Sequence, residues 1–142
     1  MRTSFMPETI MIIDDDRAIA QLTSLWVKAA GFNTIIANDG RSGLEAIARH
    51  LPNLILLDIR MPEMDGFEVN CRLRQTPGLS EIPVIFLSAH AQETTRQESL
   101  AGGGRCFLPK PYEVKNLIAA IRAVLSGQSI DQGACLCPIK QS

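Results

Sequence analysis

The sequence lacks any apolar run that is long enough to cross a membrane. Its longest uninterrupted apolar segments have about four to five residues, whereas a membrane-spanning helix needs roughly 18 or more. Residues 1–7 also lack the apolar core of a signal peptide. We therefore expect a cytoplasmic protein without membrane contact.

An excess of charge of either sign is missing as well. The 14 Lys and Arg residues nearly balance the 15 Asp and Glu residues, and the formal net charge is −1. Proteins that bind nucleic acid or anionic membranes through their overall charge carry a clear positive excess. Direct binding to nucleic acid is therefore not expected.

Cysteine is scarce, and its four positions do not form the pattern of a disulfide framework. Cys71 and Cys106 lie within segments of periodic apolar sequence, whereas Cys135 and Cys137 lie near the end of the chain. Two thiols do not complete a zinc site. We expect reduced cysteines and no metal or redox role for Cys135 and Cys137.

Short apolar runs rich in β-branched residues are present along the whole chain, and such runs are typical of strands buried on both faces. In the clearest case, four apolar residues are followed at once by Asp58 and then by Pro62 and Gly66. The predicted strands cover residues 9–13, 34–37, 54–58, 82–87 and 106–108.

Segments with helical spacing of apolar residues separate these strands. Asp16 and Asp39 are placed to cap the first two helices. The predicted helices cover residues 17–30, 40–51, 66–74, 91–101 and 114–126. The positions expected to pack are Ile19, Leu22, Leu25, Trp26 and Ala29, then Leu44, Ile47 and Ala48, then Phe67, Val69 and Leu73, and finally Val114, Leu117, Ile118, Ile121 and Val124. The 91–101 segment holds only Leu100 as a large apolar residue and should be weakly anchored.

The alternation of strands and helices indicates a parallel sheet, because parallel neighbours must be joined by right-handed crossovers. We predict an α/β fold, in which a doubly wound five-stranded parallel sheet lies inside a three-layer α/β/α sandwich. Residues 9–126 form the expected domain, with an N-terminal extension at 1–8 and an irregular tail at 127–142. No internal repeat or second domain is visible.

Polar side chains stand where four of the predicted strands end. Asp14 and Asp15 follow the first strand, Asp58 ends the third, Ser88 follows the fourth, and Lys110 follows the fifth. Because these ends share one edge of a parallel sheet, we expect the side chains to converge there. Clustered carboxylates repel one another, and a hard divalent cation such as Mg²⁺ relieves this repulsion.

This set of groups is suited to phosphoryl transfer. Mg²⁺, the Lys110 ammonium and the Ser88 hydroxyl together would offset the charge of an incoming phosphoryl group. Asp58, the last residue of its strand, is the expected nucleophile.

Four motifs follow one another along the chain: Ile13-Asp14-Asp15-Asp16, Leu57-Asp58-Ile59-Arg60-Met61-Pro62-Glu63-Met64-Asp65-Gly66, Leu87-Ser88-Ala89 and Phe107-Leu108-Pro109-Lys110-Pro111. Together, over about residues 9–126, they resemble the receiver domain of two-component response regulators. The resemblance implies the flavodoxin-like strand order 2-1-3-4-5. It also implies that Asp58 accepts a phosphoryl group from the phosphohistidine of a histidine kinase or histidine phosphotransfer protein. In such domains the transfer and the later hydrolysis are self-catalysed, so the resemblance implies a signalling phosphoacceptor and not a conventional enzyme.

The resemblance assigns further roles. Asp15, Asp58 and the Arg60 backbone carbonyl would bind Mg²⁺, and Asp14 would support the water shell of the metal. Arg60 and His90 match positions that tune the lifetime of the phosphoryl group, and the Lys110–Pro111 bond would be cis.

Switching is also implied by the resemblance. Ser88 would move toward the phosphoryl group and Phe107 would swing inward, which changes the surface of the fourth helix, fifth strand and fifth helix. A downstream protein partner would read this surface, and a phosphorylation-dependent dimer is compatible with it. The kinase, the partner, and whether the chain stands alone or belongs to a larger regulator or hybrid kinase stay open.

Three alternatives are less consistent with the sequence. Asp14 and Asp16 have the Asp-x-Asp spacing of haloacid-dehalogenase-type phosphatases, but Ala18 and the Pro111-Tyr112 pair depart from that family's pattern. A flavodoxin-like flavin carrier would need a Ser- and Thr-rich phosphate loop after the first strand. A receiver-like binding module that is not phosphorylated remains open, although no key residue is missing.

Overall fold

The computed structural model describes residues 7–88 and 106–127. The expected helix at 91–101, His90, Cys135 and Cys137 lie outside the described residues, as do most of the expected extension and tail. Within the described ranges, no helix is both long and apolar enough to cross a membrane.

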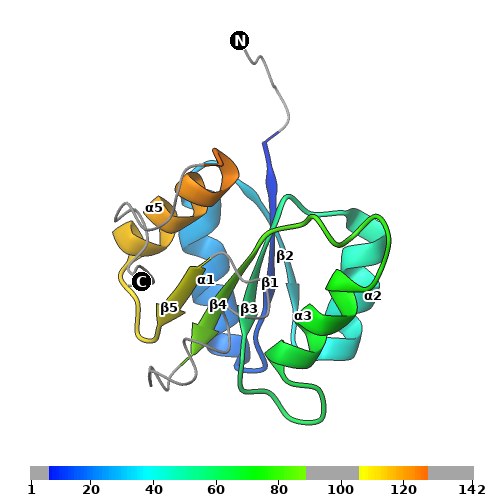
Figure 1. Ribbon diagram of the computed structural model, residues 1–142. Helices are drawn as coiled ribbons and strands as arrows, with labels where there is room; N and C mark the ends of the chain where they lie inside the picture. The colour runs from blue at the N-terminus through cyan, green and yellow to red at the C-terminus, as the bar shows by residue number, and fades with distance from the viewer. Residues whose placement is uncertain (1–6, 89–105, 128–142) are drawn as a thin grey trace, which may run out of the picture.

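A five-stranded parallel sheet runs through the middle of the molecule (Figure 1). Its order is β2-β1-β3-β4-β5, as the resemblance implied. The strands are β1 (Thr9–Ile13), β2 (Asn33–Ala37), β3 (Leu54–Asp58), β4 (Val84–Ser88) and β5 (Cys106–Pro109). β4 begins two residues later than expected, because Pro83 has no N–H to donate to a strand ladder. The Pro83 carbonyl still accepts a hydrogen bond from the Ile55 amide at 3.0 Å.

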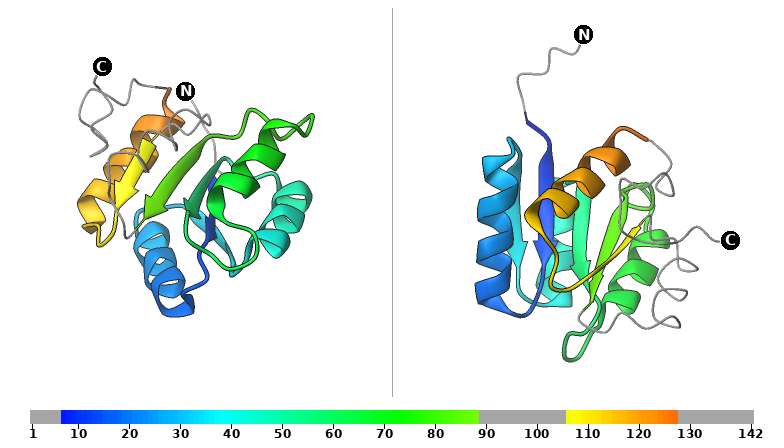
Figure 2. Two further views of the ribbon diagram at one scale, coloured as in Figure 1. Left: turned by 60° about the horizontal axis from the view of Figure 1, so that its bottom comes forward. Right: turned by 90° about the vertical axis from the view of Figure 1, so that its left-hand side faces the viewer.

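Helices cover both faces of the sheet, which confirms the three-layer sandwich (Figures 1 and 2). The helices are α1 (Arg17–Ala29), α2 (Gly40–His50), α3 (Gly66–Arg74) and α5 (Val114–Leu125). α1 and α5 lie on one face, and α2 and α3 lie on the other. Asp16, Asp39 and Asp65 cap the first three, each accepting a hydrogen bond from the amide three residues later.

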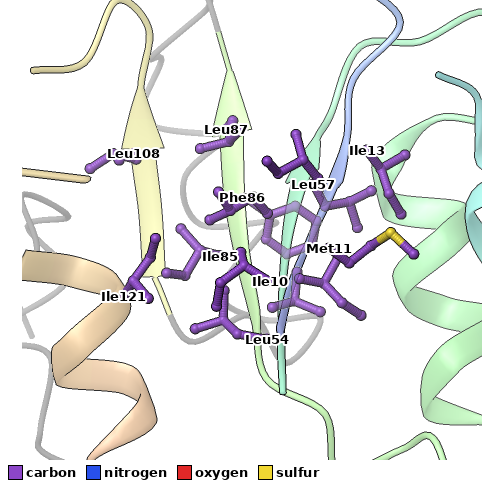
Figure 3. Close-up of a cluster of buried hydrophobic side chains, with 14 of the residues drawn as sticks. Ile10, Met11, Ile13, Leu54, Leu57, Ile85, Phe86, Leu87, Leu108 and Ile121 are labelled. Carbon is purple, nitrogen blue, oxygen red and sulfur yellow. The ribbon is translucent and has the colours of Figure 1, made fainter. Parts of the chain in front are cut away.

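The core lies on both sides of the central strands (Figure 3). Every residue of β3 and β4 is buried, which explains why these strands read as continuous apolar runs. Burial of each large aliphatic side chain contributes roughly 1.5 to 3 kcal/mol. Asp58 and Ser88 therefore sit at the ends of the most firmly held strands.

The prediction of the packing face of α1 was partly wrong: Ile19 and Trp26 are half-buried, and Trp26 packs against the core, but Ala29 is exposed. Leu22 and Leu25 are 45% and 61% exposed, and the buried residues are instead Ala20, Thr23, Ser24 and Val27. Both sets have helical spacing, so periodicity alone cannot choose between them. The smaller side chains let α1 approach the sheet closely. In the later helices, Ala48 and Val114 also proved to be exposed.

Candidate functional site

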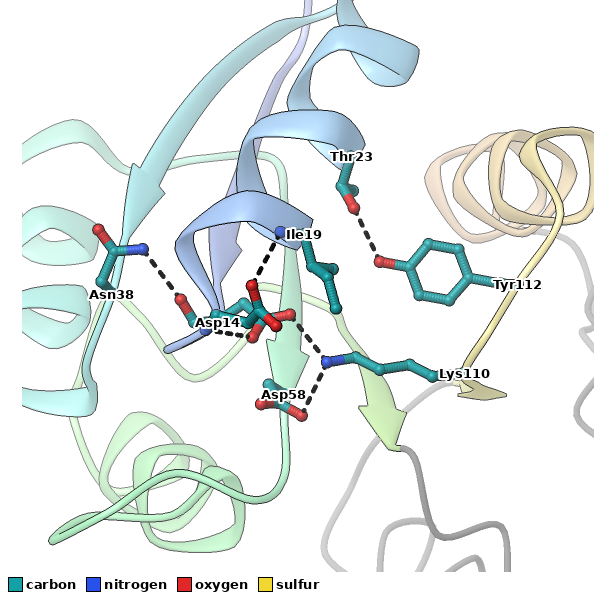
Figure 4. A network of polar contacts seen from close by, with 8 residues as sticks. Asp14, Ile19, Thr23, Asn38, Asp58, Lys110 and Tyr112 are labelled. Atoms are coloured by element: carbon teal, nitrogen blue, oxygen red, sulfur yellow. Dashed lines mark hydrogen bonds and ion pairs between the residues drawn. The ribbon is translucent and has the colours of Figure 1, made fainter.

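The turn after β1 brings Asp14 to the edge of the sheet and holds it there. The Asp14 amide donates to the Ala37 carbonyl at 3.1 Å, and one Asp14 carboxylate oxygen accepts from the Asp16 amide at 2.9 Å. Asn38 donates its Nδ2 to the Asp14 carbonyl at 3.0 Å (Figure 4). Asp14 is buried and Asp15 is exposed, so this turn presents one carboxylate inward and one toward solvent.

Asp58 ends β3 beside this turn and is almost fully buried. The following loop folds back closely, since the Gly66 amide donates to the Ile59 carbonyl at 2.9 Å. A Cβ atom at position 66 would meet the Asp58 carbonyl oxygen at 2.5 Å, so only glycine fits there. The loop thus fixes the backbone on which the Asp58 side chain stands.

Lys110 brings a positive charge to the two buried carboxylates from a distant part of the chain. Its Nζ lies 2.9 Å from Asp14 Oδ2 and 3.5 Å from Asp58 Oδ1 (Figure 4). The Lys110 amide donates to the Ser88 carbonyl at 2.7 Å, which continues the pairing of Ser88 with Pro109 in the sheet. The end of β4 therefore sets the point at which Lys110 leaves the sheet.

Charge and burial compete at this site. Burial is the main cause that raises the pKa of Asp58 to about 7; the Lys110 ammonium lowers it, and the Asp14 and Asp15 carboxylates raise it further. Burial by itself would lower the pKa of Lys110, but its hydrogen bond to Asp14 and the charges of both buried carboxylates raise it. Asp58 is therefore only partly ionised near neutral pH, whereas Lys110 stays protonated.

The three carboxylates form a group that could hold a metal ion. Asp14, Asp15 and Asp58 each offer one oxygen, and these oxygens lie within 4.8 Å of one another. Within residues 7–88 and 106–127, the ion pairs to this group come from one ammonium, that of Lys110, which does not balance three carboxylates. An all-oxygen donor set with this excess of negative charge suits a hard divalent cation.

The structure also describes Ser88, Phe107 and Arg60 among the other predicted site residues. Ser88 is buried at the end of β4, and Phe107 is buried in β5 opposite Phe86. Arg60 is exposed just beyond Asp58, and the Lys110–Pro111 bond is cis, as the resemblance implied. Asp16 instead caps the N-terminus of α1, whereas Asp14 belongs to the acidic group. The two residues of the Asp-x-Asp pair in the phosphatase alternative therefore have different roles.

Sequence reasoning missed three residues around the site. Besides Asn38, these are Thr23 and Tyr112, whose hydroxyl oxygens lie 2.8 Å apart (Figure 4). Tyr112 also packs edge-on against Trp26, with ring centroids 6.3 Å apart. Tyr112 is half-buried, and a buried tyrosine hydroxyl usually finds a partner, but its burial could not be read from the sequence. Nothing in the sequence pointed to Thr23 as that partner.

Comparison with known proteins gives one consistent result. The family model for the response regulator receiver domain matches residues 10–122. Response regulator MprA of Mycolicibacterium vanbaalenii is 36% identical over 129 residues, which cover 91% of this chain and 55% of the relative. The DNA-binding dual master transcriptional regulator RpaA of Synechocystis is 38% identical over 116 residues, which cover 82% of this chain and 48% of the relative. The chain spans about half the length of these curated relatives.

Solved structures agree in fold. The chemotaxis protein CheY4 of Vibrio cholerae superimposes with a TM-score of 0.79 at 27% identity, over 83% of this chain and 98% of that structure. The receiver domain of the Francisella response regulator 1452 superimposes with a TM-score of 0.79 at 29% identity, over 84% of this chain and 98% of that structure.

Proposed function

This chain belongs to the receiver-domain family of response regulators, and we propose on that premise that Asp58 is the phosphoacceptor of a two-component or phosphorelay pathway. The phosphodonor would be the phosphohistidine of a histidine kinase or histidine phosphotransfer protein. The observation that carries the proposal is the position of Lys110, whose ammonium lies 3.5 Å from the Asp58 carboxylate beside the group of three acids.

In the proposed reaction, an ionised Asp58 oxygen attacks phosphorus from the side opposite the imidazole. The new P–O bond forms as the P–N bond breaks, and the electron pair of the broken bond stays on the imidazole nitrogen. Lys110 favours the ionised form of Asp58 and then donates to a phosphoryl oxygen, with the Ser88 hydroxyl as a second donor. Mg²⁺ held by Asp15, Asp58 and the Arg60 carbonyl, with Asp14 in support, would supply further charge compensation for the transferring group.

Hydrolysis of the aspartyl phosphate would return Asp58 to its free state, so the protein handles its own phosphoryl group and does not turn over an external substrate. We propose that Arg60 and His90 tune this lifetime. The exposure of Arg60 next to Asp58 is consistent with such a role.

Phosphorylation would be transmitted through β4 and β5. The hydrogen bond from the Lys110 amide to Ser88 and the pairing of Phe86 with Phe107 connect the site to β5. We propose that Ser88 and Phe107 act as the switch, and that residues 92–100, β5 and α5 form the output surface. A downstream protein, or a second phosphorylated copy, would bind there. Residues 9–126 would form this cytoplasmic receiver, without direct contact to nucleic acid.

Labelling with acetyl phosphate and Mg²⁺ tests the proposal. The parent should take up one phosphoryl group on Asp58, and Asp58→Asn should take up none. Asp65→Asn is a matched control, because Asn also caps helices and Asp65 lies outside the acidic group, so this variant should label like the parent. Equal labelling of Asp58→Asn would refute the assignment of the nucleophile, and an unlabelled parent would favour a binding module that is not phosphorylated.

A further inference from the structure

Two consecutive residues of α1 send hydroxyl hydrogen bonds in different directions. Thr23 bonds the Tyr112 hydroxyl at 2.8 Å, and Ser24 bonds the Thr34 hydroxyl at 2.7 Å. Both α1 residues are buried, and the two bonds have the same chemistry. Only the bond from Thr23 reaches the segment that carries Lys110. The bond from Ser24 can therefore serve as a control for substitutions that remove the bond from Thr23.

The segment from Lys110 to Tyr112 joins β5 to α5, and its two ends are held differently. At the β5 end, the Lys110 amide is bonded to the Ser88 carbonyl at 2.7 Å. At the α5 end, Glu113 is the N-cap residue but makes no side-chain cap hydrogen bond. The Tyr112 hydroxyl is therefore well placed to anchor this end of the segment to α1.

Apolar packing between the segment and α1 is incomplete on the solvent side. An open pocket of about 480 Å³ lies there, lined by residues of both. Its lining residues are Ile19, Leu22, Thr23, Trp26, Lys110, Pro111 and Tyr112. Beside this open pocket, the hydrogen bond between the Thr23 and Tyr112 hydroxyls and the edge-on contact between Tyr112 and Trp26 connect the segment to α1.

We propose that Thr23 and Tyr112 are positioning residues, whose hydrogen bond fixes the segment so that the Lys110 ammonium lies between Asp14 and Asp58. Neither residue would touch the phosphoryl group; both act through Lys110. The consequence for reaction rate rests on the proposed function of Asp58, whereas the consequence for the position of Lys110 does not.

The rate test compares Tyr112→Phe, Thr23→Val and the double variant with the parent during phosphorylation by acetyl phosphate. Each single variant should lower the maximal rate about fivefold, the scale of one lost hydrogen bond, and the double variant should lower it no further. Each variant should still require Mg²⁺ for the reaction, because the segment holds none of the three carboxylates. Thr23→Ser keeps the hydroxyl and should restore the parental rate.

Ser24→Ala is the matched control, since it removes the equivalent bond to Thr34 and should leave the rate unchanged. Parental rates in both single variants, or equal slowing in Ser24→Ala, would overturn the proposal. If Tyr112→Phe does not fold, the comparison of Thr23→Val with Thr23→Ser decides the same point.

A second readout does not depend on phosphorylation. The NMR resonance of the Lys110 Cε methylene should shift in Tyr112→Phe and stay in place in Ser24→Ala. An unshifted resonance in Tyr112→Phe would refute the positioning role even if Asp58 is phosphorylated. If the parent takes no label but the resonance shifts as expected, the proposed function fails and the positioning role stands.

Discussion

Replacing Asp58 with Asn should stabilise the protein at neutral and alkaline pH in the absence of Mg²⁺. The side chain is buried beside two further carboxylates, and its pKa is raised from 3.8 to about 7, first by burial and then by those neighbours. Ionised Asp58 therefore costs free energy in the folded state that it does not cost in the unfolded chain. Asn has nearly the same shape without the charge.

The sign of the pH dependence follows from the two pKa values. Below pH 3.8 the carboxyl is protonated in both states and costs nothing, whereas between pH 3.8 and about 7 the unfolded chain loses the proton first. The cost to the folded state thus grows with pH and levels off above about 7. A pKa shift of about three units corresponds to a loss of about 4 kcal/mol in the free energy of unfolding. Because solvent screens part of this effect, we expect a loss of about 2 kcal/mol.

Urea unfolding in EDTA, from pH 4.5 to pH 8, measures this difference. The free energy of unfolding of Asp58→Asn should exceed that of the parent by about 2 kcal/mol at pH 8 and by roughly a quarter of that at pH 4.5. Asp39→Asn is a control of opposite sign, because the Ser42 amide lowers the pKa of Asp39 and this variant should not stabilise at pH 8. A pH-independent difference, or a less stable Asp58→Asn at pH 8, would refute the reasoning.

Three further variants, with one matched control, test the metal group and its support. Mg²⁺ should raise the melting temperature of the parent but not of Asp15→Ala, so an equal shift in both would exclude Asp15 from the site. Gly66→Ala should cost about 2 kcal/mol or more in urea unfolding, because its Cβ meets the Asp58 carbonyl; a cost near zero would show that the loop can move away. Asn38→Ala should lower the free energy of unfolding by about 1 kcal/mol, and titration calorimetry should show weaker Mg²⁺ binding. Asn53→Ala, which removes a bond at the other end of β1, should lose stability alone, and equal weakening of Mg²⁺ binding in both would contradict the role of Asn38.

Several features could be read from the sequence because their causes are local. A strand buried on both faces is apolar along its length, so β3 and β4 stood out as runs. The start of β4 was misplaced where Pro83 interrupts the ladder, and its end was predicted one residue early. Asp16 and Asp39 cap helices through bonds that span three residues. The convergence of polar side chains on one edge followed from parallel strands alone. The strand order, by contrast, came from the resemblance, since alternation does not specify which strands are neighbours.

Other features depended on which surfaces meet in three dimensions. α1 carries two faces with helical spacing, and only its contact with the sheet decided that Thr23 and Ser24 are buried while Leu22 and Leu25 are exposed. The partner of Thr23 lies 89 residues away along the chain, so no local pattern could indicate it. The pKa of Asp58 likewise depends on burial and on charges brought from other strands. Electrostatic and hydrogen-bond effects at this site act over a few ångströms of space, and only the folded chain sets those distances.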